Sequence, residues 1–75
     1  LVRRGDLLLT VSTGGAAPAM AAALRAWLEE AFGEEWAGRL AEVAALRARL
    51  RAEGCSPSEV IRGVRAHLDE AGWLP

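Results

Sequence analysis

The apolar residues of the chain fall into one short continuous run and three longer stretches with helical spacing. The short run covers residues 7–11 and lies between Gly5-Asp6 and Gly14-Gly15. It is too short for a helix and does not alternate, so it predicts a strand buried on both faces. Because a lone strand leaves its backbone groups unpaired, we expect a neighbour from Leu1–Arg4, from a second subunit or from a domain that is not present.

Two helices are predicted to follow the strand. The first covers about Pro18–Phe32, because proline suits a first helical turn and Gly33 follows the last periodic apolar residue. The second begins at Glu34 and Glu35, whose charge suits the positive end of a helix, and it stops before Gly54.

A third helix is predicted after Ser56-Pro57-Ser58-Glu59, which has the pattern of a capping box. Apolar residues continue at helical spacing until Gly72, and we expect the tail Trp73-Leu74-Pro75 to fold back on the helices. The predicted fold class is therefore mainly α with a short β element (α+β), in which a strand precedes three helices.

A chain of 75 residues buries only a small core and usually needs a disulfide, a metal or a partner for stability. Cys55 is the single cysteine and His67 the single histidine, which excludes an intrachain disulfide and a structural zinc set. We therefore expect a partner chain, with a homodimer as the first choice, or a missing neighbouring domain.

The charge balance, the lengths of the apolar runs and the first residues of the chain exclude some classes of function. The chain has nine arginines and ten acidic residues. The resulting net charge of −1 argues against nucleic-acid binding. No apolar run approaches the roughly 20 residues that span a bilayer, so no membrane partner is expected. Since the chain opens at Leu1 inside an apparent structural element, we expect a piece of a longer, cytoplasmic protein.

The turn between the strand and the first helix is the main candidate site. Ser12, Thr13, Gly14 and Gly15 lie where free backbone N–H groups and the positive end of a helix converge, and glycines allow a ligand to approach closely. A carboxylate or phosphate would suit this position. The alternative is a tight turn in which Ser or Thr caps the helix, since the lysine of a P-loop and the third glycine of a dinucleotide fingerprint are missing.

Other polar residues give weaker signals. Arg25, Arg47 and Arg51 could bind carboxylates, or they could be solvated or paired with Glu29, Glu30 or Glu42. His67 is expected at the surface and Cys55 in a loop, without a catalytic role. The sequence contains no recognisable catalytic set, and its large aromatic residues are expected in the core or an interface: Trp27, Trp36 and Trp73.

The stretch from Val2-Arg3-Arg4-Gly5-Asp6 through Ser12-Thr13-Gly14-Gly15 to Pro18-Ala19 resembles the siroheme synthase family, and Leu24-Arg25 and Leu28-Glu29 extend the match. The resemblance is close over about the first thirty residues and looser afterwards. Many members have serine before the proline, where this chain has Ala17, so a polar role at that position is in doubt.

The family comprises precorrin-2 dehydrogenases, some of which are also sirohydrochlorin ferrochelatases. The resemblance implies that residues 1–33 form a strand-helix dimerisation region and residues 34–75 a small helical domain. It also implies that NAD and the catalytic residues belong to a missing N-terminal Rossmann domain, so that this segment binds no cofactor and is inactive alone. Contact with the tetrapyrrole, precorrin-2 or sirohydrochlorin, would fall to Ser12, Thr13, Gly14, Gly15 and Arg25. The alternative function is a stand-alone helical protein-protein interaction module.

Overall fold

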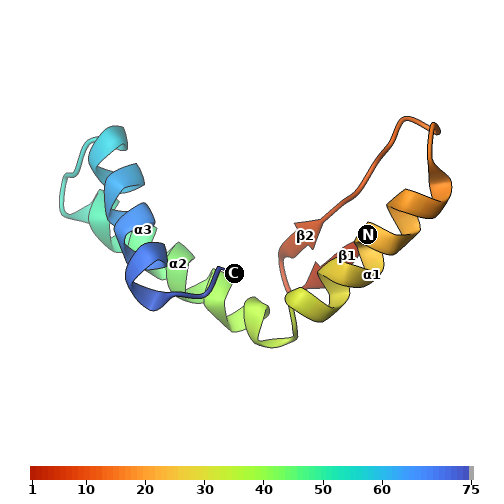
Figure 1. Cartoon of the computed structure of the whole chain (residues 1–75). Helices are drawn as coiled ribbons and strands as arrows, with labels where there is room; N and C mark the ends of the chain where they lie inside the picture. The colour runs from red at the N-terminus through yellow and green to blue at the C-terminus, as the bar shows by residue number, and fades with distance from the viewer. Residues whose placement is uncertain (75) are drawn as a thin grey trace. The chain divides into compact units, whose positions relative to one another are not determined.

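The computed structural model describes residues 1–74 and contains two strands followed by three helices (Figure 1). The chain divides into two compact units, here called the N-terminal unit, residues 1–40, and the C-terminal unit, from residue 41 onward. The predicted α+β fold class is confirmed. The elements are β1 (Val2–Arg4), β2 (Leu7–Leu9), α1 (Pro18–Ala31), α2 (Glu35–Ala52) and α3 (Pro57–Ala71).

The two strands form an antiparallel hairpin in which Val2 lies opposite Leu9 and Arg4 opposite Leu7. The connecting residues are Gly5 and Asp6, and Gly5 has a φ of 60° whereas no non-glycine residue has a positive φ. A positive φ at the first central residue alone is the pattern of a type II′ turn, which suits a two-residue hairpin. The neighbour of the predicted strand is therefore the chain's own N-terminal segment.

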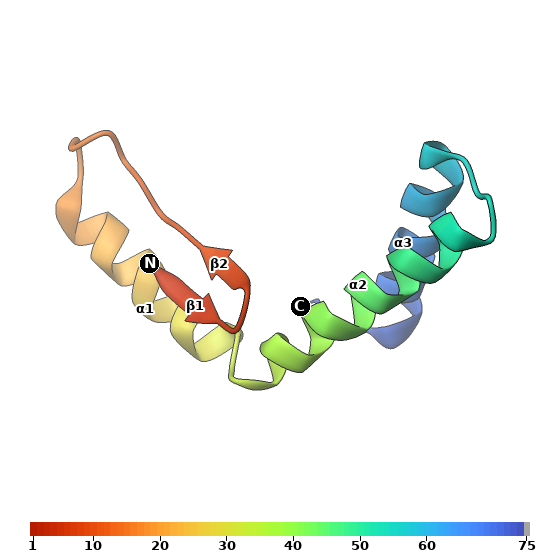
Figure 2. The same cartoon turned by 180° about the vertical axis from the view of Figure 1, so that it is seen from behind.

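Helix α1 lies against β1 of this hairpin (Figure 2). Side chains alternate across a strand, and Val2, Leu7 and Leu9 share the covered face, where Val2 is buried. Leu8 belongs to the opposite face and is 45% exposed. Within residues 1–74 the predicted strand is therefore covered on one face only, and β2 ends at Leu9 rather than Val11.

Arg4 ties the hairpin to the C-terminal end of α1. Its Nε donates a hydrogen bond to the carbonyl oxygen of Phe32 at 2.7 Å, and its Nη2 donates to that of Glu29 at 3.2 Å. The last carbonyls of a helix have no partner within the helix, and they carry its negative dipole end. Helix α1 has no basic residue in its own last turn, so the neighbouring strand supplies the positive charge.

The start of α2 completes the N-terminal unit. Trp36 is buried, and its ring lies 4.8 Å from that of Phe32 and 5.0 Å from the guanidinium carbon of Arg39. Gly5 approaches the same turn so closely that an added Cβ would lie 3.0 Å from that of Ala37. A residue with a side chain at Gly5 would thus meet both a steric and a conformational penalty.

Helices α2 and α3 make up most of the C-terminal unit, and local signals define their ends. Gly54 has a φ of 85°, its N–H donates to the carbonyl of Arg51, and that of Cys55 donates to Leu50, which is a Schellman ending for α2. The predicted capping box is confirmed, since the Glu59 N–H donates to Ser56 Oγ at 3.2 Å and the Ser56 N–H donates to Glu59 Oε1 at 2.8 Å. Helix α3 ends at a left-handed glycine, as expected.

The two helices approach closely at Gly63, where an added Cβ would lie 2.7 Å from Leu50 Cδ1. Val60 is buried on the same helix. Trp73 returns to α3, with its ring 5.5 Å from that of His67 in an edge-on contact, so the expected fold-back of the tail is confirmed for this residue. Leu74 is exposed, and Pro75 lies outside the described residues.

The helices of residues 1–74 do not include one with both the length and the apolar character needed to cross a membrane.

The capping box predicts a measurable effect on stability. Ser56→Ala should lower the free energy of unfolding by about 0.5–2 kcal/mol, because it removes the acceptor for one backbone N–H of α3. Denaturant unfolding followed by circular dichroism measures this loss. A variant as stable as the parent chain would show that the capping bond contributes nothing.

The same box predicts a dependence on pH. Hydrogen bonds from the backbone and side chain of Ser56 lower the pKa of Glu59. A carboxyl with a lowered folded pKa stabilises the fold above its unfolded pKa, and this contribution is lost as the pH falls through the folded pKa. Glu59→Gln keeps an acceptor but cannot titrate, so it should lose less stability on acidification than the parent chain. Equal losses in parallel unfolding series would contradict this assignment.

Candidate functional site

The predicted anion site is a glycine corner, residues 12–15, between β2 and α1. Gly14 and Gly15 both have left-handed backbones, with φ of 64° and 81°. A Cβ built on either residue would meet no atom within 4 Å, so the space beside this backbone is open. A flat or extended ligand can approach the peptide groups directly.

Several donors of the corner already have partners within their own loop. The Gly14 N–H donates to Ser12 Oγ at 3.3 Å, and the Ala17 N–H donates to Thr13 Oγ1 at 3.2 Å. The Ala16 N–H donates to the Thr13 carbonyl at 3.1 Å. Ser12 and Thr13 therefore accept hydrogen bonds that shape the turn, which fits the tight turn of the alternative, but neither caps α1, because the N-cap residue is Ala17 and has no side-chain cap.

The backbone donors that are left belong to Ser12, Thr13, Gly15 and the first turn of α1. The N-cap residue, Ala17, offers no side-chain cap, and the first turn has no acidic residue. Helical N–H groups at this end lack partners within the helix, and the dipole favours a negative charge here. This end of α1 can therefore accept one exposed carboxylate through a small number of donors.

Arg25 does not lie beside the glycine corner. It lies seven residues beyond Pro18, about 10 Å along the helix axis at a rise of about 1.5 Å per residue. Its side chain is exposed and forms no hydrogen bond or ion pair within residues 1–74. The structure thus leaves Arg25 available to a ligand, but only to one that extends well beyond the corner.

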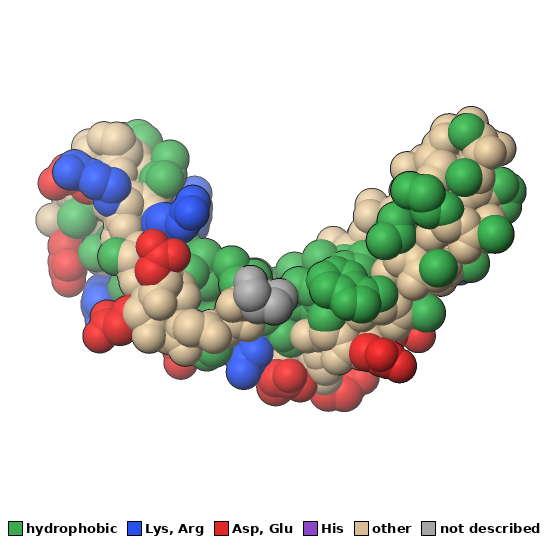
Figure 3. Space-filling model, in the orientation of Figure 1, with side chains coloured by type: hydrophobic (Ala, Val, Ile, Leu, Met, Phe, Trp, Pro, Cys, Tyr) green, Lys and Arg blue, Asp and Glu red, His purple; other side chains and the backbone are tan. Residues whose placement is uncertain are grey.

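A second surface of the N-terminal unit is apolar. Met20, Leu24 and Trp27 are 58%, 40% and 55% exposed, and their spacing places them on one flank of α1, beside the face that covers the hairpin. Leu1 and Leu8 are exposed on the hairpin. Hydrophobic side chains, green in Figure 3, form several patches on the visible face of this unit. We call these five residues the apolar flank.

The backbone beside the apolar flank is also unpaired. Thr10, Val11 and Ser12 continue β2 in an irregular stretch, and their peptide groups make no backbone hydrogen bond within the part of the chain that is described. An exposed row of unpaired peptide groups is a template for pairing with another strand.

The weaker sequence candidates fall in the C-terminal unit. Glu42 binds His67 rather than an arginine, with its Oε2 2.7 Å from His67 Nε2. Sequence reasoning missed this pair because the two residues lie 25 positions apart and on different helices. Cys55 is a half-buried loop residue, as expected. Within residues 1–74 no cluster of His, Cys, Asp or Glu is suited to hold a metal ion.

No protein-family model matches the chain, and no curated protein or solved structure shows significant similarity to it. The functional argument therefore depends on the residues and their geometry.

Thr13 provides a test of how the corner is held. Thr13→Val keeps the size of the side chain but removes the acceptor for the Ala17 N–H, so the free energy of unfolding should fall by about 1 kcal/mol. Thr13→Ser, which keeps the hydroxyl, is the matched control. If both variants unfold at the same denaturant concentration, the hydroxyl does not hold the turn.

Proposed function

We propose that this chain is the dimerisation and tetrapyrrole-binding region of a siroheme-synthase-type enzyme, a precorrin-2 dehydrogenase or sirohydrochlorin ferrochelatase. The observation that carries the proposal is the apolar flank, which leaves large side chains uncovered beside an unpaired strand segment. The chain would supply the subunit interface and part of the wall of the substrate cleft.

The apolar flank supports dimer formation on energetic grounds. Within residues 1–40 the buried apolar residues are Val2 and Trp36, while the five residues of the flank are exposed. Fully burying an exposed apolar side chain contributes roughly 1.5–3 kcal/mol, and a second copy that covered these partly exposed residues would add a fraction of that for each. Chains this small commonly depend on such burial.

The dimensions of the hairpin support the same arrangement. Neighbouring strands lie about 4.8 Å apart, whereas a helix with its side chains is about 10 Å wide. Two strands therefore cover only part of the apolar arc of α1. A strand contributed by a second copy would extend the sheet, pair with the peptide groups of residues 10–12 and cover more of this arc.

The glycine corner supports binding of a multiply carboxylated tetrapyrrole. Such a ring could place one carboxylate at the Gly15 N–H and the first turn of α1 and another at the more distant Arg25. The corner does not fit NAD, because it follows an antiparallel hairpin rather than a parallel strand and has two glycines instead of a three-glycine fingerprint. The resemblance to the family would place hydride transfer and metal insertion in an N-terminal domain of such an enzyme.

The second candidate function is a helical protein-interaction module without a ligand. The hydrogen bonds of Ser12 and Thr13 within their own loop favour it, because they use donors that a ligand would need. Both candidates use the apolar flank, but only the first predicts self-association together with tetrapyrrole binding.

Leu8→Asp should weaken dimer formation at least about tenfold, because it places a charge in the apolar interface. Leu74→Asp is the matched control, since Leu74 is also an exposed leucine but belongs to the C-terminal unit. Sedimentation equilibrium of the full chain over a concentration series measures the effect. A parent chain that stays monomeric throughout, or a Leu8→Asp variant that dimerises normally, would rule out this interface.

Gly14→Asp should lower the affinity for sirohydrochlorin at least about tenfold, because a fixed carboxylate repels the carboxylates of the ring. Gly14→Asn is the control, since asparagine has the same shape and both residues tolerate the left-handed backbone of this position. Absorbance titration of the full chain gives both affinities. Equal affinities for the two variants would remove the corner from the binding site.

A further inference from the structure

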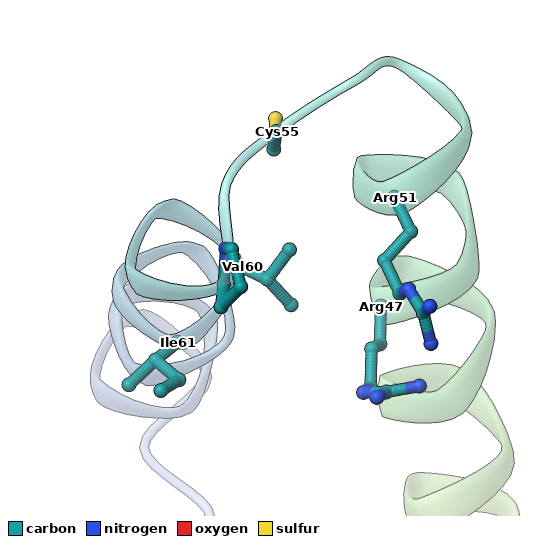
Figure 4. Close-up of a pocket in the computed structure, with 6 residues that line it drawn as sticks. Arg47, Arg51, Cys55, Val60 and Ile61 are labelled. Atoms are coloured by element: carbon teal, nitrogen blue, oxygen red, sulfur yellow. The ribbon is translucent and has the colours of Figure 1, made fainter.

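A second candidate binding site lies wholly within the C-terminal unit, where the end of α2 faces the start of α3. It is an open pocket of about 520 Å³, within the range of about 300–1,000 Å³ typical of small-molecule sites. Figure 4 shows the two helices and the residues that line the pocket, with all but Pro57 labelled. These residues are Arg47, Arg51, Cys55, Pro57, Val60 and Ile61.

One wall of the pocket carries two arginines that have no ion-pair partner among the described residues. Arg47 and Arg51 are four residues apart and therefore share a face of α2, and Figure 4 shows both side chains on the side facing α3. Neither forms an ion pair or hydrogen bond within residues 1–74. Like charges at this spacing repel weakly, and an anion bound between them would relieve that repulsion.

Several other charged residues of α2 and α3 have partners of their own. Arg49 has Glu53 at 3.9 Å and Arg65 has Asp69 at 3.5 Å, each one turn along the same helix. The carboxylate of Glu59, at the start of α3, is held by the Ser56 N–H. The sequence suggested Glu29, Glu30 or Glu42 as partners of the arginines. None of these pairs with Arg47 or Arg51 within residues 1–74, and Glu42 is bound to His67.

The opposite wall is apolar. Val60 is buried and points toward the two guanidinium groups, and Pro57 lies on the same helix turn. Ile61 is 69% exposed, the highest value among the exposed large hydrophobic side chains of residues 1–74. Two unpaired guanidinium groups line one side of the pocket and exposed aliphatic carbon lines the other. Such a pocket suits a ligand that has an anionic group and an aliphatic part.

We propose that this pocket binds a small organic anion that carries an aliphatic chain. The carboxylate or phosphate group pairs with Arg47 and Arg51, since guanidinium binds both groups through paired hydrogen bonds. The aliphatic part covers Ile61 and Pro57. This inference uses no residue of the glycine corner or of the apolar flank, so it stands or falls independently of the proposed function.

Titration of the ¹⁵N-labelled full chain, followed by NMR, tests the proposal with hexanoate and hexyl phosphate as probes. Acetate and inorganic phosphate test the need for the aliphatic part, and 1-hexanol tests the need for the charge. At least one hexyl anion should bind about tenfold more tightly than its short counterpart and than hexanol, with saturable shifts at the lining residues. The hexanoate and hexyl phosphate titrations show which head group is preferred.

Substitutions then assign the binding to the pocket. Arg47→Gln with Arg51→Gln should lower the affinity for the preferred probe at least about tenfold, because it removes both guanidinium groups. Arg49→Gln with Arg62→Gln removes the same charge outside the pocket and should change the affinity less than about twofold. Ile61→Ser should reduce the advantage of the hexyl anion over its short counterpart without altering the charge.

The proposal is overturned if hexanol binds as tightly as the anions, if acetate and phosphate match the hexyl probes, or if the two double variants lose affinity equally. Circular dichroism checks that each variant keeps its helices. Should the Arg47 and Arg51 double variant lose helicity, the Ile61→Ser variant decides the question, since unchanged discrimination between hexyl and short anions would also contradict the proposed site.

Discussion

The N-terminal unit depends on the attachment of Arg4 to the end of α1. A two-stranded hairpin is not stable alone, and α1 lacks a basic residue where its dipole is negative. The guanidinium of Arg4 meets both needs, because it donates to the carbonyls of Phe32 and Glu29 while its own strand lies against the helix. The attachment fixes which face of the hairpin is covered, and it leaves the glycine corner to connect β2 with the opposite end of α1.

The apolar flank follows from that arrangement. A single helix covers one face of two strands, so the side chains of Leu8 and Trp27 remain uncovered although their types favour burial. In a chain with few buried residues, the uncovered area is as important for stability as the core. This is why the proposed function places a second copy on this surface, and why it assigns a structural role to the region rather than a catalytic one.

The two candidate binding regions recognise negative charge by different means. At the glycine corner the donors are backbone groups, and the loop itself uses those of Gly14 and Ala17, so only a ligand with several carboxylates gains much there. In the pocket between α2 and α3 the donors are the side chains of Arg47 and Arg51, beside exposed aliphatic carbon. The glycine corner therefore suits a large anion with several carboxylates. The pocket suits a small anion that also has an aliphatic part.

The sequence by itself determined the helices, the capping box at Ser56 and Glu59, and the glycine that ends α2, because these features depend on hydrogen bonds between residues a few positions apart. It also placed the glycine corner between a strand and a helix. Only the tertiary structure decided that Val2–Arg4 is the partner strand, that α1 packs against this strand, and that His67 binds Glu42. These outcomes depend on contacts between segments distant in the chain, and neither hydrophobic periodicity nor capping signals encode which distant segments meet.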